Sequence, residues 1–85
     1  MRTMENGTSQ TYLNSLINFA EVKDLEGVVF ALRRLETHLA SDIPLYVANG
    51  LRDLRYLVDL GDYQAIKRRA SLLSYELDSR EVQAV

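Results

Sequence analysis

The chain has 85 residues, a formal net charge of −2 and a hydrophobic fraction of 47%. This length corresponds to one small domain, and the apolar content is too high for a disordered chain. The absence of cysteine excludes disulfides and thiolate metal sites. Acidic and basic residues are interspersed without a strong basic excess, so we do not expect a dedicated binder of nucleic acid or of an anionic membrane.

The first predicted helix covers residues 9–22 and follows a polar lead over residues 1–8, which we expect to be flexible. Thr8 or Ser9 is expected to cap this helix, because a hydroxyl can accept a hydrogen bond from a free backbone N–H. Its apolar residues follow the i, i+3, i+4, i+7 spacing of one helical face, and they are Leu13, Leu16, Ile17 and Ala20.

The second predicted helix starts after Asp24, a good N-cap residue, and continues to about Leu39. Glu26 lies in its first turn, where a negative charge interacts favourably with the helix dipole. The apolar stripe of this helix consists of Leu25, Val28, Leu32, Leu35 and Leu39. Val29 and Phe30 extend the stripe over more than one face, which favours self-association into a homodimer.

The third predicted helix begins near Pro44, whose missing N–H costs nothing in a first helical turn, with Ser41 or Asp42 as the cap. It continues to about Leu60 and carries apolar residues at helical spacing: Ile43, Val47, Leu51, Leu54, Leu57 and Val58. Gly50 lies inside this helix at a cost of about 1 kcal/mol relative to alanine. We therefore expect either a closely approaching neighbouring backbone or a locally weak helix at Gly50.

Gly61 and Asp62 are predicted to end the third helix and to cap the fourth. The fourth helix is expected to end near residue 78, before a frayed tail over residues 79–85. Its apolar stripe consists of Ile66, Ala70, Leu73 and Leu77. No segment alternates between apolar and polar residues over a strand length, so we expect no strands.

The apolar pattern of segment 12–39 recurs in segment 50–77. We call this alignment, in which residue 12 falls on residue 50, the hairpin offset. It places Asp24 on Asp62, and each aspartate starts the second helix of its pair. A fixed period of roughly 20–50 residues is typical of stacked helix–turn–helix units, although two amphipathic hairpins in phase also produce it. Because short turns force antiparallel neighbours, we predict one all-α domain over residues 9–78, with four antiparallel helices arranged as two hairpins.

Residues 60–66, with the sequence Leu-Gly-Asp-Tyr-Gln-Ala-Ile, resemble the turn and second-helix start of a tetratricopeptide repeat. The resemblance covers about one helix and turn. It implies a two-repeat stack in which the first helix of each hairpin lines a peptide-binding groove. An up-down four-helix bundle is the alternative architecture, and it needs no repeat.

Groups suited to catalysis are scarce. His38 is the only histidine, and a cation near the end of the second helix complements the helix dipole. The sequence has no calcium loop, phosphate loop or nucleophile elbow. We therefore expect no enzyme and no catalytic, metal or cofactor site. The sequence also lacks a signal peptide and an apolar run of about 20 residues, so we expect a cytoplasmic protein without a membrane span.

A polar and aromatic face on the third helix is the candidate binding site. Tyrosine and arginine are enriched at protein interfaces because they combine apolar area with hydrogen bonding. Two asparagines of the first helix occupy positions that align with this face. The predicted protein-binding residues are Asn14, Asn18, Tyr46, Asn49, Arg52 and Tyr56. They indicate a protein–protein interaction module, such as a small adaptor, chaperone or regulator.

A small basic strip on the fourth helix supports an alternative function. Lys67, Arg68 and Arg69 are consecutive, and in a nucleic-acid-binding regulator they would contact phosphates. A solvated helix face explains the same three residues without a ligand. Protein binding is therefore the primary prediction, and nucleic-acid binding is the alternative.

Overall fold

The computed structural model describes the backbone of residues 2–39 and 43–84 and the side chains of residues 9–39 and 43–79. The described backbone forms four α-helices and no strand. The helices are α1 (Arg2–Glu21), α2 (Leu25–His38), α3 (Leu45–Leu60) and α4 (Tyr63–Ala84). The predicted all-α domain with four helices is therefore confirmed.

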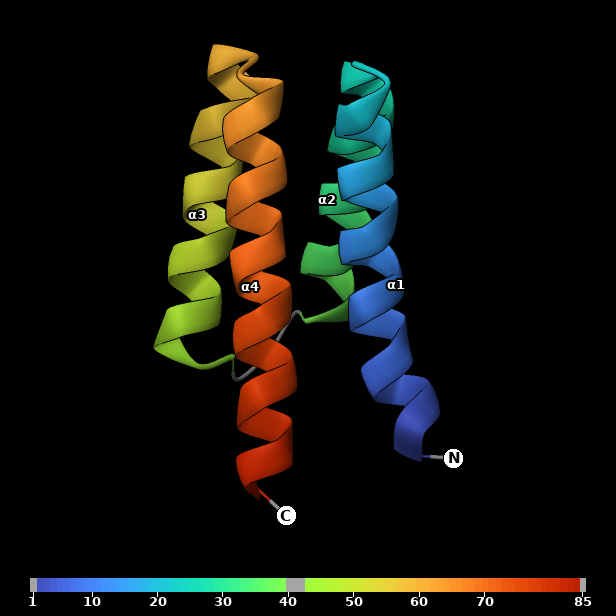
Figure 1. The fold of residues 1–85 in the computed structure, drawn as a ribbon, viewed down its shortest axis with the longest axis vertical. Helices are drawn as coiled ribbons and strands as arrows, with labels where there is room; N and C mark the ends of the chain where they lie inside the picture. Colours follow the sequence, from blue (N-terminus) through green and yellow to red (C-terminus); the bar gives the residue numbers. More distant parts are fainter. Residues whose placement is uncertain (1, 40–42, 85) are drawn as a thin grey trace.

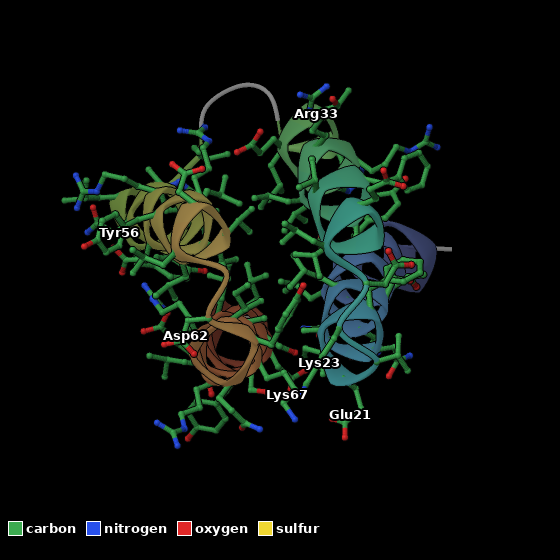
Figure 2. All side chains as sticks on the ribbon, turned by 90° about the horizontal axis from the view of Figure 1, so that it is seen from above. Glu21, Lys23, Arg33, Tyr56, Asp62 and Lys67 are labelled. Atoms are coloured by element: carbon green, nitrogen blue, oxygen red, sulfur yellow. The ribbon has the colours of Figure 1, made fainter. Side chains whose placement is uncertain are left out.

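The four helices lie side by side with their long axes close to vertical in Figure 1. Seen from above, they occupy the corners of a four-sided arrangement in which α1 neighbours α2 and α4, and α3 neighbours α4 and α2 (Figure 2). Contacts are densest between α1 and α2 and sparsest between α2 and α3. Within the described residues, the backbones of α1 and α3 do not approach each other closely, because the two helices lie at diagonal corners.

The hydrophobic core lies between the helices and is built from residues of the predicted apolar stripes together with Ala31, which was not predicted. Its buried members are Leu13, Leu16, Ala20, Val28, Ala31, Leu32, Leu35, Val47, Leu51, Leu54, Ile66, Ala70 and Leu73. Leu25 was also predicted in a stripe, but it is 38% exposed. It is the first residue of α2, next to the turn, where the helix has only just begun to pack against its neighbours.

The first turn, between α1 and α2, closes with a Schellman motif. Lys23 has a left-handed backbone with φ of 60°. Its N–H donates to the carbonyl of Ala20 at 3.1 Å, and the N–H of Asp24 donates to the carbonyl of Phe19 at 2.8 Å. The carboxylate of Asp24 then accepts a hydrogen bond from the N–H of Gly27 at 3.1 Å, which confirms Asp24 as the N-cap of α2.

The second turn, between α3 and α4, repeats this geometry at the hairpin offset. Gly61 has φ of 69°, and its N–H donates to the carbonyl of Val58 at 3.0 Å. The N–H of Asp62 donates to the carbonyl of Leu57 at 3.2 Å, and the carboxylate of Asp62 accepts from the N–H of Ala65 at 3.1 Å. Every donor and acceptor in the second turn aligns with its counterpart in the first. The predicted roles of Gly61 and Asp62, which end the third helix and cap the fourth, are confirmed.

The outer ends of α1 and α4 differ from the prediction. Helix α1 begins at Arg2 instead of Ser9, and α4 ends at Ala84 instead of near residue 78. Ser9 is only 8% exposed and lies inside α1, so it is not a cap, and neither is Thr8. The apolar pattern marks only the part of a helix that packs on the core, whereas the backbone hydrogen bonds continue beyond it.

The start of α3 also differs slightly from expectation. Pro44 is the N-cap, just before the first helical residue, and its side chain makes no cap hydrogen bond. The expected caps Ser41 and Asp42 lie outside the described residues. Gly50 has a close neighbour, but it is not the expected backbone, because a Cβ added there would lie 3.1 Å from Cδ2 of Leu73. The neighbour is a side chain of α4, which accounts for a glycine inside this helix.

Candidate functional site

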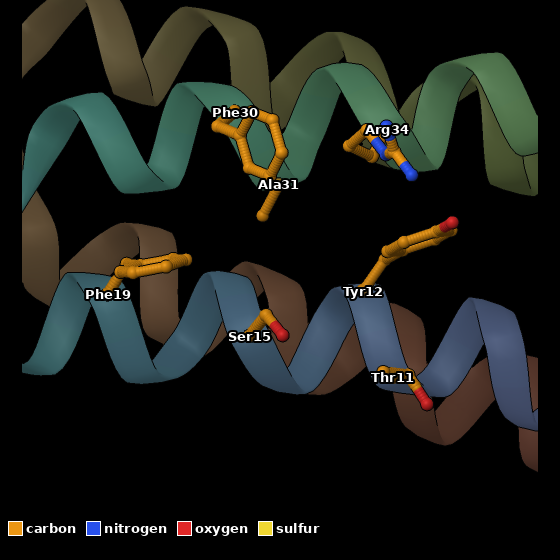
Figure 3. A pocket seen from close by; sticks show the side chains of 7 residues that line it. All are labelled: Thr11, Tyr12, Ser15, Phe19, Phe30, Ala31 and Arg34. Atoms are coloured by element: carbon orange, nitrogen blue, oxygen red, sulfur yellow. The ribbon is translucent and has the colours of Figure 1, made fainter.

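A surface groove with an aromatic lining lies between α1 and α2 (Figure 3). It combines a hollow of about 290 Å³ with an adjoining hollow of about 310 Å³, and the two share Tyr12 and Arg34. We call this recess the α1/α2 groove. It is lined by Thr11, Tyr12, Ser15 and Phe19 of α1 and by Phe30, Ala31, Arg34, Thr37 and His38 of α2.

The groove exists because small side chains lie between large ones. Figure 3 shows Ser15 and Ala31 in its middle, with Phe19 and Phe30 toward one end and Tyr12 and Arg34 toward the other. Tyr12, Ser15 and Phe19 share one face of α1 because they are separated by three and four residues. The hollow is therefore the space that the hydroxymethyl and methyl groups of two small residues leave unfilled.

Phe19 reaches the groove through a glycine. A Cβ added at Gly27 would lie 2.4 Å from Cδ1 of the Phe19 ring, so only glycine allows the ring to rest on α2 at this point. The ring is half-buried and packs against the core. Gly27 thus holds one wall of the groove in place without contributing a side chain to it.

Two ring contacts organise the rest of the lining. The guanidinium carbon of Arg34 lies 5.6 Å from the centroid of the Phe30 ring, which is a cation–π distance. The rings of Tyr12 and His38 meet edge to face, with centroids 5.8 Å apart. Phe30 nevertheless remains 61% exposed. A large aromatic side chain is therefore left open to solvent at the rim of an aromatic recess.

The α1/α2 groove offers recognition chemistry and lacks the group clusters of a metal site. Among the described residues, no set of three or more His, Cys, Asp or Glu side chains could hold a metal ion. Among the described lining residues, Arg34 supplies a guanidinium, and the remaining side chains supply rings, hydroxyls, a methyl group and an imidazole. No described helix combines the length and apolar character required to cross a bilayer.

The predicted protein-binding residues do not form one continuous face. Asn14 and Asn18 are exposed on α1, whereas Arg52 and the 63% exposed Tyr56 are on α3. Because the backbones of α1 and α3 do not approach each other closely in the described part of the chain, no groove forms between them. The hairpin offset pairs equivalent positions of two helix pairs, but packing places those positions at diagonal corners.

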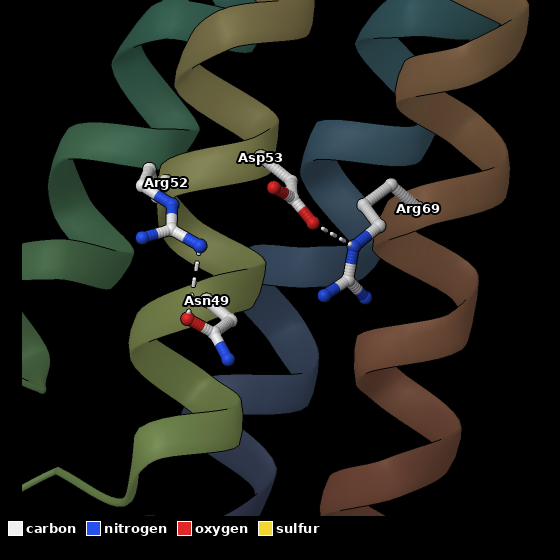
Figure 4. A network of polar contacts seen from close by, with 4 residues as sticks. All are labelled: Asn49, Arg52, Asp53 and Arg69. Atoms are coloured by element: carbon white, nitrogen blue, oxygen red, sulfur yellow. Dashed lines mark hydrogen bonds and ion pairs between the residues drawn. The ribbon is translucent and has the colours of Figure 1, made fainter.

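Two other residues of the predicted binding face, Tyr46 and Asn49, are half-buried and contact other residues of the protein. Tyr46 is half-buried and packs against the core. Asn49 is also half-buried, and its Oδ1 accepts a hydrogen bond from Nη2 of Arg52 at 3.1 Å (Figure 4). On this helix, Arg52 and Tyr56 are therefore the more accessible residues of the predicted set.

The basic strip is largely neutralised by ion pairs within the protein. Nζ of Lys67 lies 2.8 Å from Oε1 of Glu21, and this hydrogen bond and charge lower the pKa of the Glu21 carboxyl. Nε of Arg69 lies 2.9 Å from Oδ2 of Asp53 (Figure 4), and the Arg69 side chain is only 18% exposed. Arg68, by contrast, is exposed.

The sequence interpretation did not identify the α1/α2 groove. It assigned Phe30 to a widened apolar stripe and did not single out Phe19, Tyr12 or Arg34. A usable signal was present, because Gly27 and Ala31 are one helical turn apart on the face of α2 that meets α1. Two small residues one turn apart allow a neighbouring side chain to approach closely or leave a gap. The structure contains both, because the Phe19 ring lies against Gly27 and a hollow lies beside Ala31.

No protein-family model matches this chain, and no significant match was found among the curated proteins or the solved structures.

Proposed function

We propose that this protein is a non-enzymatic protein-binding module that receives an apolar side chain of its partner in the α1/α2 groove. The observation that carries the proposal is Phe30, a large aromatic residue that is 61% exposed beside the recess of Phe19 and Tyr12. Burying a whole Phe side chain contributes about 1.5–3 kcal/mol, so a partner that covers the exposed part gains a useful fraction of this free energy. Aromatic and arginine side chains are also common hot spots of interfaces.

The proposed architecture is two antiparallel helical hairpins related as a structural repeat, with α1 and α2 as the recognition hairpin and α3 and α4 as its support. The matching turns support this relation. Burial supports it as well, because both members of five aligned pairs are buried: Leu13 and Leu51, Leu16 and Leu54, Val28 and Ile66, Leu32 and Ala70, and Leu35 and Leu73.

The comparison of the two hairpins singles out the α1/α2 groove. At the hairpin offset, Ser15 aligns with Asp53 and Ala31 aligns with Arg69. Where α1 and α2 leave a hollow, α3 and α4 are bridged by the Asp53–Arg69 ion pair at 2.9 Å (Figure 4). The second hairpin thus fills the place that the first leaves open, which is the difference expected if only the first binds a partner.

This difference supplies a sharp experiment. The double substitution Ser15→Asp with Ala31→Arg introduces the Asp–Arg ion pair of the second hairpin into the groove and leaves Phe30 and Arg34 unchanged. We call this double substitution the plugged variant. Peptides are selected from a displayed random library on the full chain and then titrated against this variant and against Phe30→Ala. Both variants should weaken binding at least tenfold, because one fills the recess and the other removes its aromatic rim.

A matched control is Tyr56→Ala, which removes an equally exposed aromatic residue from α3. It should leave peptide binding unchanged. Circular dichroism must show that the helical content of all variants equals that of the unmodified protein. Peptides that bind the plugged variant and Phe30→Ala with unchanged affinity would overturn the proposed function.

A nucleic-acid-binding regulator is the competing proposal, with Lys67, Arg68 and Arg69 as phosphate contacts. Any phosphate would have to compete with Glu21 for Lys67 and with Asp53 for Arg69. A gel shift with duplex DNA at low salt separates the two functions, because phosphate contacts weaken steeply as salt is added. A shift that is lost in Arg68→Glu and at higher salt would favour the nucleic-acid function.

A further inference from the structure

We propose that the occupant of the α1/α2 groove is an acidic peptide segment of another protein, which places a bulky apolar side chain in the hollow and a carboxylate beside Arg34. This inference rests on the proposed function and names the chemistry of its partner. The hollow beside Phe19 and Phe30 sets the first requirement, because its volume of about 290 Å³ lies just below the roughly 300–1,000 Å³ typical of small-molecule sites. A space of this size suits one inserted side chain.

The charge at the groove sets the second requirement. Arg34 is exposed, and the structure shows no ion pair for it among the described residues. Its contact with the Phe30 ring holds the cation beside the hollow. None of the described residues that line the two hollows is a carboxylate, so an acid that a partner brings would match the cation. A carboxylate pairs well with a guanidinium because two parallel N–H···O bonds can form.

The charges along α2 also determine in which direction the bound peptide segment lies. Glu26 lies one helical turn before Phe30 on α2 and has the opposite sign from Arg34, which lies one turn after Phe30. An acidic residue of the partner is therefore favoured at the Arg34 end of the groove and disfavoured at the Glu26 end. The hydroxyl of Thr37 and the imidazole of His38 line the Arg34 end and can add hydrogen bonds to the same carboxylate.

The same charges argue against a second copy of this chain as the occupant. A two-fold contact centred on the groove would place the same patch of both copies face to face. Each copy would then bring an Arg34 cation, and the described lining residues would bring no carboxylate to neutralise the pair. Like charges placed opposite each other across an interface oppose binding.

The test uses the displayed peptide library on the full chain, with selection at low and at physiological salt. The selected sequences should be enriched in Asp or Glu next to an aromatic or leucine residue. The best peptide and a version with its acidic residues replaced by Asn or Gln are then titrated against the unmodified protein, Arg34→Gln, Arg34→Lys and Arg33→Gln.

We expect Arg34→Gln to weaken binding of the acidic peptide about tenfold and Arg34→Lys to weaken it less. The neutral peptide should bind the unmodified protein and Arg34→Gln equally. Arg33→Gln is the matched control, because Arg33 is exposed on α2 but lines the recess between α2 and α3. It removes the same charge from the chain and should change the affinity less than twofold.

Three results would overturn the inference. If the peptides require Phe30 but are insensitive to Arg34 and to their own acidic residues, the groove binds an apolar anchor alone, and the proposed function survives. If Phe30→Ala has no effect, the proposed function fails as well. If no peptide is selected and sedimentation shows self-association that Phe30→Ala abolishes, the occupant is a second copy.

Discussion

The two turns make a quantitative prediction about Lys23, the only described non-glycine residue with positive φ. Its backbone at φ of 60° matches that of Gly61 at 69°, and both residues close the same hydrogen-bonded motif. Glycine adopts this conformation without steric cost, whereas the Cβ of any other L-residue crowds the backbone. Lys23→Gly should therefore stabilise the protein.

The magnitude follows from two opposing terms. The left-handed conformation costs a non-glycine residue roughly 1–2 kcal/mol. Glycine loses more backbone freedom on folding, which costs roughly 0.5–1 kcal/mol. The difference is a gain of about 0.5–1 kcal/mol, which corresponds to a rise in Tm of about 2–8 °C for a domain of this size. Gly61→Lys should lower the free energy of unfolding by a similar amount for the same reasons.

Thermal and urea unfolding followed by circular dichroism measure both changes. Lys23→Ala is the control, since it removes the lysine side chain but keeps a Cβ in the left-handed region. Its Tm should stay close to that of the unmodified protein. The exchange of both residues, Lys23→Gly with Gly61→Lys, should leave the stability nearly unchanged. If Lys23→Ala stabilises as much as Lys23→Gly, the backbone explanation is wrong.

Two further predictions concern contacts at the groove and at the α1–α4 boundary. Gly27→Ala should destabilise the protein by about 1 kcal/mol. Overpacking against the Phe19 ring costs about 1–3 kcal/mol, whereas the higher helix propensity of alanine contributes about 1 kcal/mol in the opposite direction. Urea unfolding measures the change in the free energy of unfolding. Lys67→Gln should flatten the acid side of the stability–pH profile. The lowered pKa of Glu21 makes this pair stabilising above the usual carboxyl range, and the stabilisation is lost as pH falls through the folded-state pKa.

Each of these predictions has a matched control. In a Phe19→Ala background, Gly27→Ala should become stabilising, because the ring that blocks the added methyl group is gone. A continued loss of stability in that background would contradict the steric explanation. For the pH profile, Glu21→Gln should flatten the same region as Lys67→Gln, and combining both should add nothing. Additive effects of the two substitutions would show that the groups titrate independently.

The success of the fold prediction can be traced to particular residues. Asp24, Gly61 and Asp62 act through short-range hydrogen bonds and backbone preference, so their roles were visible without tertiary information. The outer limits of α1 and α4 were wrong because no cap or core contact marks them in the sequence. The left-handed backbone at Lys23 was missed because lysine carries no preference for it.

The candidate site was less accessible to sequence reasoning. Exposure of Arg52 and Tyr56 could be predicted from helical periodicity, since each lies opposite a buried stripe. The pairing of the helices could not be predicted, because the pattern of an amphipathic helix specifies its buried face but not which other helix covers that face. Residues of α1 and α3 were therefore grouped on one face although the packing of the helices separates them, and the α1/α2 groove was overlooked.

The sequence by itself determined the number of helices, their buried faces and the matching turns at Asp24 and Asp62. These features depend on the spacing of apolar residues and on local caps. Only the tertiary structure decided that Ser15 and Ala31 leave a hollow while their counterparts Asp53 and Arg69 form a bridge. The physical reason is that a cavity or an ion pair between helices depends on which side chains face each other across two backbones, and spacing along one chain does not fix this.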